Sequence, residues 1–222
     1  QAFRQVFSYF EANIYHRFDL PIRRFLLELA PFERFDLEMA RMVSGDPHTG
    51  ERLDWLLSHT TMLRYDDVQH FHFWPQFRAF LLWEMERDYS EEKRRALFSR
   101  GGLYYELKED YAHALDCYTR GGDHAKVSEL LIRNAELHPG MGHYAEMEKY
   151  YRSLPESEIL ASPSLMQGMS MLCALAADYE GSERWYQELQ KFASRCSKQD
   201  GAGKQARSRL AWLDISLPQR GV

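Results

Sequence analysis

The chain has 222 residues, of which 45% are hydrophobic and 27% are charged, and its formal net charge is -5. A sequence of this length and composition is typical of a soluble globular protein with one large domain or two smaller ones. The negative charge excludes a general attraction of the chain to nucleic acid or to an anionic membrane surface.

Helical periodicity dominates the first sixty residues. A second helix is expected to begin at Asp19-Leu20-Pro21, with Asp19 as its N-cap, and to end before Pro31. A third is expected over residues 37–43 with Asp36 as its cap, and a short fourth over residues 51–58. The first helix of the chain is predicted from apolar residues that share one helix face, namely Phe3, Val6, Phe7, Phe10 and Ile14.

A β-hairpin follows these helices. Residues 62–65 and 68–73 read as strands on either side of the turn Asp66-Asp67, and an amphipathic helix follows Trp74-Pro75. Three short helices followed by a two-stranded wing is the order of elements in a winged helix. We therefore predict a winged-helix domain with a small β-hairpin wing over residues 1–89.

Two histidines of the second strand raise the question of a metal site. His70 and His72 are two residues apart, so on a strand their side chains share a face and could chelate an ion. No further histidine or cysteine follows them at a ligand-like spacing. We therefore expect no metal site here, and histidines that are solvated or hydrogen-bonded at the edge of the wing.

From about residue 90 the chain shows no strand signal, and small and large residues recur at fixed spacing. The first unit contains Phe98, Gly102, Tyr105, Tyr111, Ala114, Tyr118 and Gly121. A shift of 33 residues gives Leu131, Ala135, His138, Tyr144, Met147, Tyr151 and Leu154. A further 35 residues give Met166, Ser170, Cys173, Tyr179, Ser182, Tyr186 and Leu189. These periods lie close to the repeat of about 34 residues in tetratricopeptide helix pairs.

The fold class predicted for the whole chain is therefore mainly α. A tetratricopeptide-like, right-handed helical-repeat array is expected over residues 90–222, with about three helix pairs. Residues 197–208, which include Gly201, Gly203 and Lys204, are expected to form a loop. Residues 210–215 are expected to begin a fourth pair.

The repeat register also predicts which side chains line the concave face of the array. They are Ser99, Leu103, Glu106, Glu129, Ile132, Glu136, Gln167 and Met171. This face would bind a small-molecule, peptide or protein effector, or it would pack against neighbouring domains. Basic residues gather later in the chain, either in a solvated connection or in a contact to an acidic partner domain. They are Lys191, Arg195, Lys198, Lys204, Arg207 and Arg209.

Neither catalysis nor direct DNA binding is favoured. The chain lacks the GxSxG, GxxxxGK[ST] and GxGxxG motifs, so we expect no catalytic residues and no enzyme activity. Helix 51–58 and the wing are net acidic, which would repel phosphates, although a sequence-specific DNA-binding winged helix remains an alternative. We expect Trp55, Leu56 and Leu57 to be packing residues.

Compartment and completeness can also be predicted. The longest uncharged run, residues 159–177, is interrupted by Ser162-Pro163, Gln167 and Gly168, which indicates a buried helix and no membrane span. The cysteines are odd in number and widely spaced, which favours free thiols in the cytoplasm. The chain begins at Gln1 without Met, so we expect a fragment of a longer protein.

Three segments carry a resemblance to a known family. FLLELAPFERFDLEMARMVSG, DWLLSHTTML and FHFWPQFRAFL resemble the module that follows the ATPase core in large ATP-dependent LuxR-type regulators, which are maltose-regulator-like. In that family an ATPase is followed by a winged helix, a tetratricopeptide-like superhelix and a DNA-binding helix-turn-helix. Where the family commonly has an aromatic-His-x-Leu-Phe run, this chain has Trp74 for the histidine and Gln76 for the leucine, and keeps Phe77. A histidine contact to nucleotide is therefore not part of the resemblance.

The resemblance implies the middle of a transcriptional regulator. The winged helix would pack on an ATPase outside this chain and transmit its nucleotide state, while the repeats would sense an effector. ATP is then implied only for that ATPase, DNA is bound only through a separate C-terminal domain, and this chain needs no cofactor of its own. The alternative is a stand-alone helical-repeat adaptor for protein–protein interactions.

Overall fold

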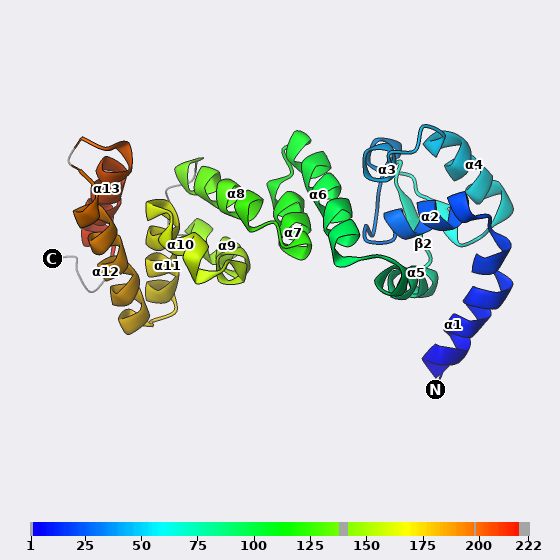
Figure 1. Cartoon of the computed structure of the whole chain (residues 1–222), viewed down its shortest axis with the longest axis horizontal. Coiled ribbons are helices and arrows are strands. Elements are labelled where there is room, and N and C mark those ends of the chain that lie inside the picture. The colour runs from blue at the N-terminus through cyan, green and yellow to red at the C-terminus, as the bar shows by residue number, and fades with distance from the viewer. Residues whose placement is uncertain (1, 138–141, 198, 218–222) are drawn as a thin grey trace. The chain divides into compact units, whose positions relative to one another are not determined.

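The structure of the protein is a computed structural model, which describes residues 2–137, 142–197 and 199–217. Helices make up 77% of it, which confirms the predicted mainly α fold class (Figure 1). By packing, the chain forms two compact units, residues 1–121 and residues 122–222. The domain boundary predicted between residues 89 and 90 is a division by type of fold, and it stays a prediction.

The first unit begins with short helices whose starts are set by local capping. These elements are α1 (Ala2–Asn13), η1 (Tyr15–Arg17), α2 (Leu20–Leu29), α3 (Leu37–Ser44) and α4 (Thr49–His59). The Asp19 carboxylate accepts a hydrogen bond of 2.9 Å from the Ile22 amide, and that of Asp36 accepts one of 2.7 Å from Met39. Both predicted N-caps are confirmed, because each carboxylate satisfies a helix N–H group that otherwise has no partner.

The wing follows as the predicted antiparallel hairpin. Its strands are β1 (Leu63–Tyr65) and β2 (Phe71–Phe73), with Leu63 opposite Phe73, and α5 (Pro75–Asp88) leaves it. The second strand begins later than residue 68, where it was predicted to begin. The reason is that the Asp66 carboxylate accepts hydrogen bonds from the amides of Val68 and His70 and so holds this segment in a turn.

An aromatic core joins these elements. Phe10 of α1 meets Phe77 of α5 edge to face with 5.5 Å between ring centroids, and Phe35 packs on Phe71 and Phe73 of β2. Burial of each such ring stabilises the fold by about 1.5–3 kcal/mol. The face predicted for the first helix is confirmed for Phe7, Phe10 and Ile14. Val6 is 41% exposed, so its assignment was wrong, and the Phe3 side chain lies outside the described part.

The first helical pair belongs to the same unit as the winged helix. It consists of α6 (Glu91–Leu107) and α7 (Tyr111–Gly121), which lie side by side (Figure 1). A Cβ atom on Gly102 would lie 2.6 Å from the Tyr118 ring, so the predicted close approach of this small and this large residue is present. Helix α6 also packs on α3, and its Gly101 lies directly against the ring of Phe32, in the connection between α2 and α3.

The second unit contains only helices among its described residues. They are α8 (His124–Leu137), α9 (Gly142–Ser153), α10 (Glu156–Leu160), α11 (Pro163–Leu175), α12 (Tyr179–Arg195) and α13 (Gly201–Ser216). In the pair α11–α12 the small residues Ser170 and Ser182 are fully buried, and the Ser170 hydroxyl donates a hydrogen bond of 2.9 Å to the Ser182 carbonyl. The array of helices predicted after the winged helix is therefore present. In the described part of the chain, the helices all lack the length and apolar character that a bilayer crossing requires.

Two parts of this unit differ from the sequence prediction. The short helix α10 was not predicted, and α13 begins at Gly201, so the loop predicted over residues 197–208 is wrong. Gly203 is buried, and a Cβ there would lie 2.8 Å from Cys196 Cβ, so this glycine permits close packing and is not part of a flexible loop. The described residues of the late basic group consequently lie on the helices α12 and α13, and not in a connection. His138 and Lys198 lie outside the described residues.

Candidate functional site

Two cavities of the first unit lie between α2 and α4. One of about 520 Å³ is bounded by α2 and the loop after α3, and one of about 640 Å³ by α4 and the residues before α2. Because His48 and Arg52 line both cavities, we treat them as one groove and call it the α2–α4 groove. The side chains that give it its chemical character are Arg17, Phe18, Leu20, Arg24, Glu28, Asp46, His48, Arg52 and Trp55.

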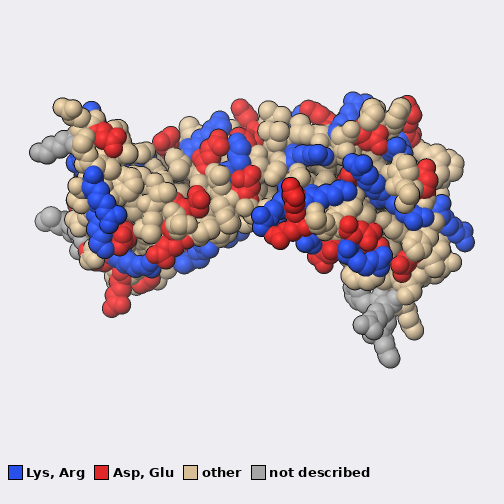
Figure 2. Space-filling model, viewed as in Figure 1, with Lys and Arg blue, Asp and Glu red and all other residues tan. Residues whose placement is uncertain are grey.

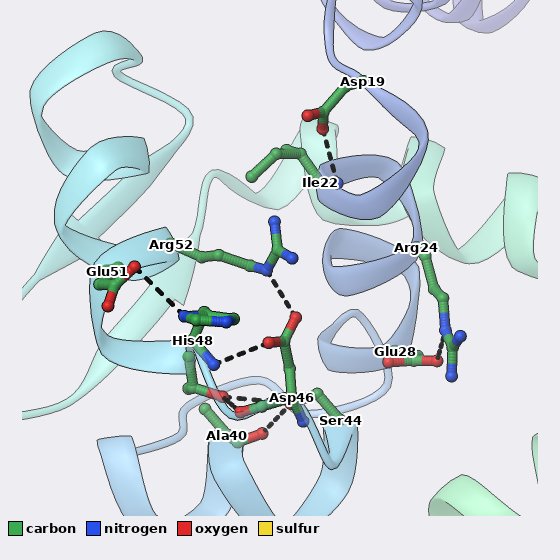
Figure 3. Close-up of polar contacts among 11 residues, drawn as sticks. Asp19, Ile22, Arg24, Glu28, Ala40, Ser44, Asp46, His48, Glu51 and Arg52 are labelled. Atoms are coloured by element: carbon green, nitrogen blue, oxygen red, sulfur yellow. Dashed lines mark hydrogen bonds and ion pairs between the residues drawn. The ribbon is translucent and has the colours of Figure 1, made fainter.

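Asp46 organises the loop that forms one wall of this groove. One carboxylate oxygen accepts a hydrogen bond of 2.8 Å from the His48 amide, and the other accepts one of 2.5 Å from Arg52 Nε (Figure 3). Burial alone would raise the pKa of the Asp46 carboxyl, but the His48 N–H and the Arg52 guanidinium outweigh it and hold that pKa below its usual value. The wall is therefore a charged, locally rigid turn.

The charges on the floor and rim of the groove are also paired. Glu28 is only 3% exposed, and its carboxylate accepts a hydrogen bond of 2.8 Å from Arg24 Nε (Figure 3). At the rim, His48 and Glu51 form an exposed contact of 3.3 Å, which contributes little to stability. Most charged side chains of the groove pair with one another. The groove therefore suits a partner with a mixed polar and apolar surface and not a phosphate backbone.

The outward face of α4 continues this surface. Leu56 is buried, as predicted, but Trp55 is 40% exposed and Leu57 is 36% exposed, so their assignment to the core was wrong. The physical reason is the helical turn of about 100° per residue, which prevents three consecutive side chains from facing one core. Trp55 stacks on His59 with 4.5 Å between ring centroids and meets Phe18 edge to face.

In a DNA-binding winged helix this helix and the wing would meet the duplex. Here the exposed residues of α4 include Glu51 and Asp54, and the wing turn carries Asp66 and Asp67. Asp66 is paired with Arg34, and Arg64 lies over the Trp74 ring at 5.5 Å. On the face drawn in Figure 2, basic and acidic side chains are interspersed over both units. Neither α4 nor the wing offers a basic surface.

The two wing histidines join no cluster of metal-ligating side chains within the described part of the chain. No three histidine, cysteine, aspartate or glutamate side chains of the described residues come together as metal ligands. The Nδ1 atoms of His70 and His72 are buried and make no hydrogen bond to described residues. The expectation of solvated or hydrogen-bonded rings is therefore wrong for these two atoms. The three cysteines of the chain are free thiols, as predicted.

The predicted concave-face residues fall on three helices. Ser99, Leu103 and Glu106 share one face of α6, where Leu103 is 45% exposed and Glu106 accepts a hydrogen bond of 2.9 Å from the Tyr118 hydroxyl. On α8, Glu129 and Glu136 are exposed and Ile132 is half-buried.

The remaining two members, Gln167 and Met171, lie on α11 and are at most 2% exposed. Every residue from 163 to 174 is buried, because the other helices of the second unit surround α11. These two side chains therefore reach no surface in this structure. The binding role of the other six stays a prediction.

The sequence analysis did not identify the α2–α4 groove. The pairing of Asp46 with Arg52 follows from the geometry of the turn between α3 and α4. The only signal was the Asp46-Pro47-His48 run directly after the C-cap Gly45, a sequence typical of a side-chain-stabilised turn.

Comparison with known proteins gives an independent result for this region. No curated protein matches the chain. Residues 11–93 match the family model described as the MalT winged helix domain. The matched segment contains α2, α3, α4, both strands of the wing and α5, in the order expected for this domain. These residues therefore belong to the MalT winged helix family, and this match supports a MalT-like, LuxR-type regulator fragment.

Proposed function

We propose that the chain is the non-catalytic middle of such a regulator, acting in the cytoplasm. Its winged helix packs on an ATPase domain that is not part of this chain, and its helical array binds an effector or a partner. ATP is bound by the ATPase, and DNA by a separate helix-turn-helix domain. The adjacent domains of the regulator are thus its first partners.

One observation carries this proposal, namely the character of the exposed face of α4. The helix that would read DNA in other winged helices presents Trp55 and Leu57 beside Glu51 and Asp54. Exposed aromatic side chains next to paired charges favour a protein interface, whereas phosphate contacts need Arg and Lys. The α2–α4 groove beside Trp55 would receive side chains of the partner.

A second observation supports the proposal that the winged helix transmits the nucleotide state of the ATPase to the repeats. Tyr104 of α6 donates a hydrogen bond to Asp36, and Arg100 of α6 donates one of 2.8 Å to the Val43 carbonyl. Together with the contact between Gly101 and Phe32, these bonds hold the first helical pair against α3 and the connection before it. A rotation of the winged helix on its ATPase would carry this pair with it as a rigid body.

The test uses the ATPase segment expected from the coding sequence upstream of this chain. We expect the purified segment to bind the chain more tightly in one nucleotide state than in the other, by calorimetry with ATP or ADP present. Trp55→Ala should weaken binding by at least about tenfold, as for an interface hot spot. Leu107→Ala, on an exposed part of α6, is the matched control. Equal binding of all variants would exclude α4 as the interface.

The second candidate function is a stand-alone helical-repeat adaptor. It keeps the interface on α4 but has neither ATPase nor DNA-binding partner domains. Reading the coding sequence on both sides decides between the two, since a phosphate-loop motif upstream and a helix-turn-helix downstream support the regulator. A titration of the chain with duplex DNA at low salt should be flat in both cases. Salt-dependent binding would instead support a DNA-binding winged helix.

The effector is sought by its effect on stability. A specific ligand of the folded chain raises its melting temperature by mass action. We expect such a shift from a member of a library of small molecules and peptides, and we expect Glu129→Gln or Glu136→Gln on α8 to reduce it. If both variants keep the full shift, the exposed α8 residues are not part of the effector site.

A further inference from the structure

The outward face of α4 carries two carboxylates that the arginine of the same helix does not balance. Glu51 and Asp54 are both exposed, and residues three positions apart are neighbours on a helix surface. Arg52 of α4 is instead directed to Asp46, whose carboxylate accepts a hydrogen bond of 2.5 Å from its Nε (Figure 3). The guanidinium group nearest in sequence to the two exposed carboxylates is therefore already used.

In the described part of the chain, neither carboxylate is paired with a lysine or an arginine. Glu51 contacts the His48 ring at 3.3 Å, and an imidazole is charged only when it is protonated. The Asp54 side chain makes no ion pair with any described residue. On the facing wall of the α2–α4 groove, Arg17 and Asp19 contribute one charge of each sign. The two carboxylates of α4 therefore remain as an excess of negative charge on this surface.

An exposed indole ring lies next to these two charges. Trp55 is four positions after Glu51, so its side chain lies one turn further along the same helix face. The side chain is 40% exposed, although the His59 ring stacks on it with 4.5 Å between ring centroids. Cations are attracted to the faces of aromatic rings, and to tryptophan most strongly. Two unbalanced carboxylates beside an exposed indole therefore form a surface that attracts a cationic side chain.

We propose that this surface, formed by Glu51, Asp54 and Trp55 and called here the α4 acidic face, receives an arginine side chain of the partner. The proposal rests on the proposed function, in which α4 contacts the ATPase domain, and it names the chemistry of that contact. A planar guanidinium group stacks on an aromatic ring and donates hydrogen bonds to a carboxylate at the same time. A lysine ammonium is a more strongly hydrated point charge and stacks less well. The same charges speed the encounter of the two domains, and salt weakens this effect.

Calorimetric titration of the whole chain with the purified ATPase segment, at low and at high salt, tests the charge of this face. The double variant Glu51→Gln, Asp54→Asn should bind about tenfold more weakly at low salt. The loss should be smaller at high salt, because screening already removes part of the attraction. The matched control Glu86→Gln, Glu92→Gln removes the same two charges from exposed positions on α5 and α6, and it should bind like the original chain.

A charge swap identifies the partner's side chain. Among single Arg→Glu variants of the ATPase segment, at least one should bind the original chain more weakly and recover its affinity with Glu51→Arg. Absence of any such recovery would overturn the proposal, and recovery of Lys→Glu variants alone would overturn the assignment to arginine.

The further proposal and the proposed function fail in different ways. If Trp55→Ala weakens binding but the double variant binds like its control, α4 is the interface and the cationic partner is wrong. A segment that binds neither the original chain nor any variant would overturn both proposals. Because Glu51 and Asp54 are exposed, both variants should fold, and melting of each protein alone checks this.

Discussion

The hydroxyl group of Tyr104 on α6 donates a hydrogen bond of 2.6 Å to the carboxylate of Asp36, which at the same time caps α3. One oxygen of Asp36 accepts from Tyr104 and the other accepts from the Met39 amide. A single carboxylate thus fixes the start of a winged-helix element and the position of the first repeat helix. This relationship explains why the winged helix and α6–α7 pack as one compact unit.

Replacement of Tyr104 by phenylalanine tests the strength of this connection. The ring stays buried, but the Asp36 carboxylate loses a partner in a mostly buried place, so the free energy of unfolding should fall by about 1.5–3 kcal/mol. Urea denaturation followed by circular dichroism measures the change. Tyr65→Phe on the exposed wing is the control and should change stability by less than about 0.5 kcal/mol. Equal effects of both variants would contradict a structural role of the bond.

We expect Gly→Ala substitutions in the helices to change stability in opposite directions at different positions. Gly→Ala inside a helix normally stabilises by about 0.5–1 kcal/mol. At Gly101 and Gly102 an added Cβ would overlap the rings of Phe32 and Tyr118, so we expect each alanine variant to lose about 1–3 kcal/mol. Gly201, at the start of α13, has no neighbouring atom within 4 Å of such a Cβ. Gly201→Ala should therefore be neutral or stabilising.

Thermal melting of the three alanine variants in parallel decides this. A gain of stability in Gly101→Ala would mean that α6 does not approach Phe32 as closely as the structure has it. The same result in Gly102→Ala would remove the evidence for close packing in the first helical pair. Loss of stability in Gly201→Ala would indicate a general need for glycine in these helices and not a need for space.

The contrast between these glycines also shows what a sequence can reveal. The caps Asp19 and Asp36 were predictable because their hydrogen bonds span only three residues. Gly201 and Gly203 indicated a loop by composition, but α13 runs through both. Gly203 lies so close to Cys196 that a larger side chain would not fit there. This close contact depends on how α12 and α13 meet. Hydrogen bonds between residues close in the sequence could therefore be predicted, and contacts between helices could not.

The candidate sites show the same limit. Periodicity assigned Gln167 and Met171 correctly to one helix but could not show that neighbouring helices bury both. It also could not show that Arg78 and Arg120, which are 42 positions apart in the chain, share the Pro31 carbonyl. By contrast, the winged-helix order of three helices and a hairpin was fully visible, because each element has its own period and its own turn residues.

Asp46 should make the folded chain less stable at acidic pH than at neutral pH. Its pKa is held below the usual value in the folded chain, so its contribution is present at neutral pH and is lost as the pH falls through that lowered pKa. Asp46→Asn should lose about 1–2 kcal/mol at pH 7, because the charge-assisted bond to Arg52 disappears. The difference from the original chain should shrink below about pH 4, where the carboxyl becomes protonated.

Asp67→Asn in the exposed turn of the wing is the matched control for this substitution. Urea denaturation at several pH values between 3 and 7 measures both variants against the original chain. A loss in Asp46→Asn that stays constant across this range would show that the effect comes from the shape of the turn and not from the charge of the carboxylate.

Glu84 should make stability depend on pH in the opposite direction. Its side chain is fully buried, and one oxygen makes a contact of 2.7 Å with Arg87 while the other has no hydrogen-bond partner among the described residues. Burial raises the pKa of this carboxyl, although Arg87 lowers it in part. The folded chain therefore binds the proton more tightly than the unfolded chain, and stability must fall as the pH rises above about 4.3.

Glu84→Gln removes this dependence, since the amide carries no charge at any of these pH values. We expect the variant to be as stable as the original chain near pH 4.5 and more stable than it at pH 7.5, with the difference growing until the pH passes the raised pKa of Glu84 and constant above it. Urea denaturation at both pH values measures it, and Glu86→Gln, an exposed neighbour on α5, is the control. A variant that is less stable than the original chain at pH 7.5 would show that the ion pair with Arg87 outweighs the unfavourable burial of the charge, and the pH slope should then have the opposite sign.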